Sequence, residues 1–151
     1  MSDHASLTGA DLHEPKGITG ANSGDVYVAD GANGGAWTSN KEYVYAEIAD
    51  ISTAASSWAL SPIAGTISNY WTVIDTAITV GDATITLEIG GTPVTGSSIT
   101  IAQSGSAAGD VDTAAPSAAN TVTQGGAIEI ITDGGSTDAS KAVVLLEITP
   151  S

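Results

Sequence analysis

The stretch WTVIDTAITVGDATITLEI, residues 71–89, indicates the fold class most directly. In its second half Ile85, Leu87 and Ile89 alternate with polar residues, the period of two that buries one side of a β-strand and leaves the other in water. Its first half, 71–80, is rich in β-branched residues, and Gly81 suits the first central position of a type II′ turn. We therefore predict a β-hairpin of strands 71–80 and 83–89.

Similar patterns extend outward from this hairpin in both directions. We expect further strands around 26–28, 42–51, 99–101, 121–122, 127–132 and 141–149. Residues 52–57 have the weakest pattern, and we expect a helical turn there. Roughly eight or nine short strands separated by Gly, Asn and Asp turns predict an all-β chain, an antiparallel β-sandwich of jelly-roll-like topology.

The composition limits the classes of function. The 151 residues carry 17 acidic residues against 3 lysines and no arginine, for a formal charge of −14. Nucleic acids and anionic membranes both require clustered basic residues, so we expect neither as a partner. Without cysteine there is no disulfide, thiol nucleophile or thiolate metal site. Because 42% of the residues are apolar and only 13% charged, we expect a folded domain despite the acidity.

The first 24 residues differ from the rest of the chain. They hold several glycines and only scattered apolar residues, and they lack the positive flank and apolar run of a secretion signal. Such a segment cannot order itself alone but can dock onto a neighbour. We therefore predict an extended N-terminal arm at 1–24 and a β-sandwich domain at 25–151. The arm residues expected to make contacts are Leu7, Leu12, His13, Pro15, Lys16 and Ile18.

No pattern of residues favours catalysis. Both histidines, His4 and His13, lie in the arm, where no rigid surroundings would position a catalytic base. Asp110 and Asp112 are a tempting acid pair for glycoside hydrolysis, but they lie among small residues in an expected loop. The glycines of 31–35 lack the Lys-Ser/Thr of a phosphate-binding loop. We expect no enzyme and no cofactor.

Calcium binding is a better interpretation of these loop carboxylates than catalysis. Two candidate pairs of metal ligands are Asp110 with Asp112 and Asp133 with Asp138. Neither pair matches the spacing of a helix-loop-helix calcium site, and Asp in a β-turn is expected for turn formation alone. Turn formation is the default interpretation.

Tyr43 and Tyr45 share one face of the strand expected at 42–51. Exposed aromatic residues on one face can bind carbohydrate. The alternative is that they fill the core or a subunit interface, because the chain has no phenylalanine to do so.

Two parts of the sequence resemble a known family. Residues 7–17 (LTGADLHEPKG), followed by 24–31 (GDVYVADG) and Trp37, resemble an N-terminal motif of small tailed-bacteriophage virion proteins, the head decoration, cement or head-fibre proteins. The stretches 83–89, 104–110 and 143–148 resemble the β-rich body of the same group.

This resemblance implies a structural protein on the outer surface of a virion. It implies binding to the major capsid protein, commonly as a homotrimer, with the arm clamping the shell or a neighbouring subunit. A second hypothesis is a phage fibre or a carbohydrate-binding surface module that uses Tyr and Trp side chains. The acidic composition suits the outside of a shell, away from packaged DNA.

Overall fold

The computed structural model describes residue 21, residues 24–29 and residues 35–151. The chain divides into two compact units, Met1–Asn40 and Lys41–Ser151, and each is described by itself. The arm–body boundary predicted after residue 24 borders residues outside the described part and stays a prediction.

In the first unit, two strands form an antiparallel hairpin. Strand β1 (Asp25–Ala29) pairs with β2 (Gly35–Ser39), and Tyr27 lies opposite Trp37. Their rings meet edge to face, with centroids 5.3 Å apart. Such an aromatic cross-strand pair stabilises a two-stranded hairpin.

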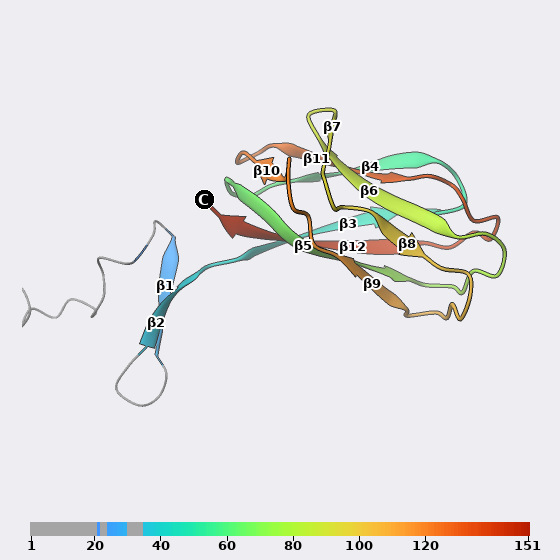
Figure 1. Cartoon of the computed structure of the whole chain (residues 1–151), viewed down its shortest axis with the longest axis horizontal. Helices are drawn as coiled ribbons and strands as arrows, with labels where there is room; N and C mark the ends of the chain where they lie inside the picture. The colour runs from blue at the N-terminus through green and yellow to red at the C-terminus, as the bar shows by residue number, and fades with distance from the viewer. Residues whose placement is uncertain (1–20, 22–23, 30–34) are drawn as a thin grey trace, which may run out of the picture. The chain divides into compact units, whose positions relative to one another are not determined.

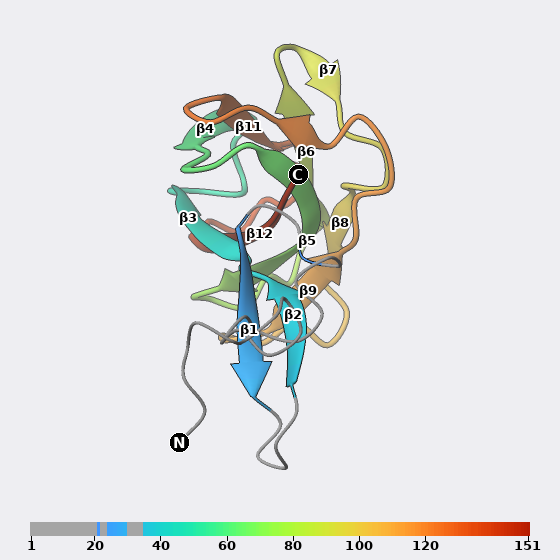
Figure 2. The same ribbon diagram turned by 90° about the vertical axis from the view of Figure 1, so that its left-hand side faces the viewer.

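The second unit, 41–151, is an antiparallel β-sandwich (Figures 1 and 2). One sheet has the order β10-β5-β12-β3, with β9 also paired to β5. The other has the order β4-β11-β6-β7, with β8 also paired to β6. The strands are β3 (Glu42–Ile48), β4 (Ala55–Leu60), β5 (Gly65–Ile74), β6 (Ala83–Ile89), β7 (Thr92–Pro93), β8 (Ile99–Ile101), β9 (Val111–Ala114), β10 (Thr121–Val122), β11 (Ala127–Thr132) and β12 (Ala142–Pro150).

The strands of this unit pair in a nested way along the chain. β3 pairs with β12, β4 with β11, and β5 with β10, so early strands meet late ones. The all-β sandwich predicted from the sequence is confirmed. Nested pairing is compatible with the predicted jelly roll, which stays a prediction.

The core lies between the two sheets and is almost entirely aliphatic. It is built by the inward residues of the alternating strands, among them Ile85, Ile130, Val144 and Leu146, all fully buried. Its one large aromatic residue is Tyr70 on β5. The Tyr70 hydroxyl donates hydrogen bonds to two backbone carbonyls, that of Ile85 on β6 and that of Ser97, which precedes β8. Burial raises the pKa of Tyr70, so this hydroxyl stays a donor.

The predicted hairpin of strands 71–80 and 83–89 is wrong. β5 ends at Ile74 and lies in a different sheet from β6, so the two do not pair. Residues between them cross from one sheet to the other: Ile78 is buried, and Asp138 accepts hydrogen bonds from the amides of Thr79 and Val80. Gly81 does have the positive φ of +79° that the turn required. The glycine conformation was therefore predicted correctly, but the amide of Gly81 bonds to Gln103 and the carbonyl of Val80 accepts from Thr137, so no hairpin turn forms there.

Two further expectations fail locally. The helical turn expected at 52–57 is replaced by β4 from Ala55, which pairs along its whole length with β11. Asp112, expected in a loop, lies on β9. A two-residue turn does occur at Gly90-Gly91, where positive φ at both glycines joins β6 to β7.

Candidate functional site

The six arm residues predicted to make contacts, at positions 7–18, lie outside the described residues. Their role stays a prediction.

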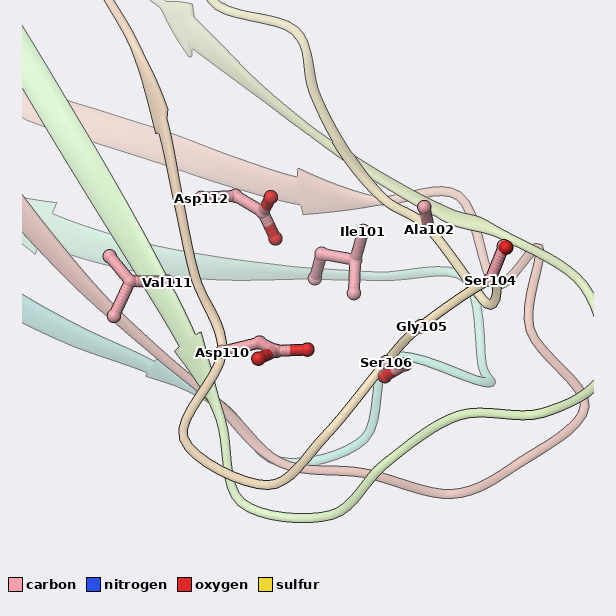
Figure 3. A pocket seen from close by; sticks show the side chains of 8 residues that line it. All are labelled: Ile101, Ala102, Ser104, Gly105, Ser106, Asp110, Val111 and Asp112. Carbon is pink, nitrogen blue, oxygen red and sulfur yellow. The ribbon is translucent and has the colours of Figure 1, made fainter.

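The structure brings Asp110 and Asp112 together at a pocket of about 170 Å³ (Figure 3). Both residues line it together with Ser106, and both carboxylates point into it. Asp110 accepts a hydrogen bond from the amide of Ala107 at 2.6 Å. Burial, together with the neighbouring charge of Asp110, raises the pKa of Asp112. The pocket therefore holds two adjacent carboxylates without a basic partner lining it.

The second pair of candidate ligands accepts hydrogen bonds from the backbone, mostly from residues distant in the chain. Asp133 accepts the amides of Thr84 and Gly135, each at 2.9 Å. The Asp138 carboxylate accepts the amide and the hydroxyl of Thr79. Backbone hydrogen bonds from Thr79 hold the pKa of Asp138 below its usual range. Within 24–29 and 35–151, no three His, Cys, Asp or Glu side chains gather as a metal site would require.

A different surface stands out, on the outer side of the sheet β10-β5-β12-β3. Two heptapeptides with the same pattern form its centre: Lys41–Glu47 reads KEYVYAE and Lys141–Glu147 reads KAVVLLE. In both, positions one and seven are Lys and Glu, and positions three and five are apolar or aromatic. Because β3 and β12 run antiparallel, each lysine meets the glutamate of the other strand.

We call this surface the tyrosine face. It consists of the outward side chains of β3, β12, β5 and β9 with the lysines that precede β3 and β12: Lys41, Tyr43, Tyr45, Glu47, Trp71, Val73, Val111, Thr113, Lys141, Val143, Leu145 and Glu147. The strand register aligns Tyr45, Leu145 and Trp71 in one row across three strands. Tyr43 and Tyr45 are 54% and 59% exposed, so they do not fill the core. Their shared face, predicted from the sequence, is confirmed.

An ion pair lies at each end of the tyrosine face. The ammonium of Lys41 lies 2.8 Å from Glu147, and that of Lys141 lies 2.6 Å from Glu47. Tyr43 and Tyr45 donate their hydroxyls to the same glutamates, at 3.0 and 2.9 Å. Each of the four outward charged residues of the two heptapeptides therefore has an opposite charge and a tyrosine hydroxyl beside it: Lys41, Glu47, Lys141 and Glu147.

These contacts shift the pKa values of the face. Burial alone would raise the pKa of Glu147, but hydrogen bonds from Lys41, Ser68 and Tyr43 outweigh it and hold the pKa below its usual value. Hydrogen bonding to Lys141 and Tyr45 lowers the pKa of Glu47 in the same way. The pKa values of Lys41 and Lys141 are raised by their glutamates. Both pairs therefore stay ionised at neutral pH.

Between the ion pairs lies an apolar groove of about 250 Å³. It is lined by Tyr45, Trp71, Thr72, Val73, Val111, Val143 and Leu145. Val111 is 63% exposed, and Leu145 is 38% exposed. Contiguous exposed apolar side chains of this size are typical of an interaction surface.

The other sheet has a contrasting outer side, which we call the tryptophan face. It carries Ser56, Trp58 and Leu60 on β4, Glu129 on β11 and Glu88 on β6. Trp58 and Leu60 are more than 60% exposed. Register places Glu129 between Trp58 and Glu88, and its hydrogen bond comes from the hydroxyl of Ser56. Both lysines of Lys41–Ser151 belong to the tyrosine face, so this face has two carboxylates and no lysine.

Beside the tryptophan face is an open hollow of about 500 Å³. It is lined by Trp58, Ile89, Gly90, Gly91, Thr121, Val122, Thr123, Gly126 and Ala127. An exposed indole next to threonines and backbone can accept the apolar face of a sugar.

No protein-family model matches the chain, and no curated protein matches it. Among solved structures, the chain is similar to one described as "Cyanophage Pam1 capsid asymmetric unit", with 20% sequence identity and a TM-score of 0.47. The likeness covers 85% of this chain and 97% of that one. A likeness at this level carries no inference about what the present chain does. In the part of the chain that the structure describes, no helix is long and apolar enough to cross a membrane.

Proposed function

We propose that this chain is a structural protein of a phage particle that binds the outer surface of the assembled capsid and stabilises it, as a homotrimer. The observation that carries a binding role is the tyrosine face: an apolar, ion-paired surface on a chain of formal charge −14. A surface of this kind suits a protein that must stay soluble alone and join partners later. The choice of a capsid rests on the sequence resemblance of residues 7–17 and 24–31.

Stabilisation would follow from mass action. A protein that binds only the assembled shell, and not free capsid subunits, lowers the free energy of the shell in proportion to the logarithm of its own concentration over its Kd. No bond is made or broken, so the role we propose is binding and not catalysis. The partner is the major capsid protein, with the arm 1–24 as the part that clamps it.

Deleting residues 1–24 tests this proposal. Shells lacking the protein are mixed with the full chain or with the truncated chain, sedimented, and then heated to measure release of their contents. We expect the full chain to co-sediment and to raise the temperature of release, and the truncated chain to do neither. Equal coating by the truncated chain would contradict the arm's role, and failure of the full chain to bind shells would contradict the function.

A second candidate is a fibre or surface module that binds carbohydrate. The hollow beside Trp58 favours it. A glycan array separates the two: strong binding that is lost in Trp58→Ala would favour this candidate, and no binding to any glycan would remove it.

A further inference from the structure

Among the described residues of Lys41–Ser151, the tyrosine face is the one extended apolar surface on which each charged side chain is paired with an opposite charge of the same face. That segment carries twelve carboxylates and two lysines. The two lysines pair with Glu47 and Glu147 on this face, so the other ten carboxylates of the segment have no lysine partner. Asp75, just beyond β5, lies near the face, because it accepts a hydrogen bond from the amide of Lys141 at 3.0 Å.

Charge decides what can cover this face. Two copies of a strongly acidic protein repel each other wherever their carboxylates approach. A surface in which each glutamate already has a lysine and a tyrosine hydroxyl lets a like-charged copy come close without leaving a carboxylate unpaired. The tryptophan face does not meet this condition, because Glu88 and Glu129 lie opposite each other there.

We propose that the tyrosine face is the contact between copies of this chain, with Tyr45, Leu145, Trp71 and Val111 at its centre. In a trimer, three such faces meet around the three-fold axis. The inference deepens the proposed function and rests on it for the assembly of several copies. Its test uses no capsids, so that either can fail while the other holds.

The area of the face indicates how strongly two copies should associate. Four strands about 4.8 Å apart, over about seven residues at about 3.3 Å each, cover roughly 400 Å² per copy. A standard stable interface buries about 800 Å² per partner. We therefore expect association that depends on protein concentration over roughly 1 μM to 1 mM.

The experiment is sedimentation velocity of the full chain over that concentration range. Tyr45→Glu places an unpaired carboxylate in the centre of the face, and Trp58→Glu places one on the tryptophan face at nearly the same exposure, 62% against 59%. We expect wild type and Trp58→Glu to form oligomers alike. Tyr45→Glu should associate at least about tenfold more weakly, because an unpaired charge buried in a contact is costly.

Val111→Glu provides a second variant whose folding is not in question, because this side chain is 63% exposed at the edge strand β9. It should weaken association as Tyr45→Glu does, with an unchanged thermal melt at monomeric concentration. Lys141→Gln leaves Glu47 without its ion pair, so its association should weaken at low salt and recover as added salt screens the charge.

Two results would overturn the proposal. The first is a wild-type chain that stays monomeric throughout the range. The second is an equal loss of association in Trp58→Glu and Tyr45→Glu.

Discussion

The two outer faces of the sandwich carry similar exposed side chains but differ in how their charges are paired. Each exposes aromatic rings above a buried aliphatic layer, Tyr43 and Tyr45 on one side and Trp58 on the other. On the tyrosine face each lysine forms an ion pair with a glutamate, whereas on the tryptophan face two glutamates, Glu88 and Glu129, lie side by side. Exposed hydrophobicity is therefore common to both faces. What differs between them is whether the neighbouring carboxylates are paired with lysines, and we base the proposed contact surface on that difference.

The largest expected effect concerns the layer that the two faces share. Leu146→Ala on β12 and Ile130→Ala on β11 each remove a fully buried side chain, from beneath the tyrosine and the tryptophan face respectively. Each should lower the free energy of unfolding by about 2–5 kcal/mol, because it leaves a cavity in a close-packed core. Urea denaturation measures this. A cost confined to one of the two variants would mean that the sheets do not share one core.

A smaller effect should separate the faces. Glu147 is buried and accepts hydrogen bonds from Lys41, Tyr43 and Ser68, so Glu147→Gln should destabilise the protein by about 1–2 kcal/mol. The matched Glu129→Gln removes one member of a like-charged pair and should stay within about 0.5 kcal/mol of wild type. Equal costs for both would remove the electrostatic distinction between the faces.

The pH dependence of stability follows from the same pair. The pKa of Glu147 in the folded protein lies below its ordinary value of 4.5, so the native state binds fewer protons than the unfolded state near that pH. Its contribution is present in full above about pH 4.5 and is lost as the pH falls through the lower, folded value. Wild type and Glu147→Gln should therefore differ most near neutral pH and converge in acid. Thermal melts from pH 7 to pH 2.5 measure the convergence, and a constant difference would contradict it.

The smallest effect is expected at the acidic pocket. Burial and Asp110 raise the pKa of Asp112, so its charged form costs free energy in the native state at pH 7. Asp112→Asn should stabilise the protein by a few tenths of a kcal/mol, because solvent screens much of this partly open site. Addition of millimolar calcium during the melt is the control. A calcium-dependent rise in the wild-type melting temperature that Asp112→Asn abolishes would support the metal interpretation instead.

The sequence predicted those strands whose inward residues are large and aliphatic. The strands at 83–89 and 127–132 have the predicted bounds, because alternating Ile and Leu mark a buried face without help from any neighbour. β4 was missed because its inward side offers Ser57 and Ala59, which carry little hydrophobic signal, while its large Trp58 points outward. β4 is a strand because β11 pairs with it, and that partner is about 70 residues away in the chain.

The candidate site was predicted only in part for the same reason. Alternation places Tyr43 and Tyr45 on one side of a strand, and that much is local. That Lys41 meets Glu147 and Lys141 meets Glu47 depends on the antiparallel register of β3 with β12. The repeated Lys–Glu heptapeptide was the signal that could have suggested it, because two antiparallel strands with this pattern bring opposite charges together at both ends.

The pairing of β3 with β12 also has a consequence during synthesis. Among the described strands β12 is the only backbone partner of β3, and 106 positions separate Lys41 from Glu147. At a translation rate of about 5–20 residues per second, β3 waits roughly 5–20 s outside the ribosome before its partner exists. During that time an unpaired strand edge with two exposed tyrosines is available to other nascent chains. The segment Glu42–Ile48 is therefore where we expect a chaperone to bind this chain first.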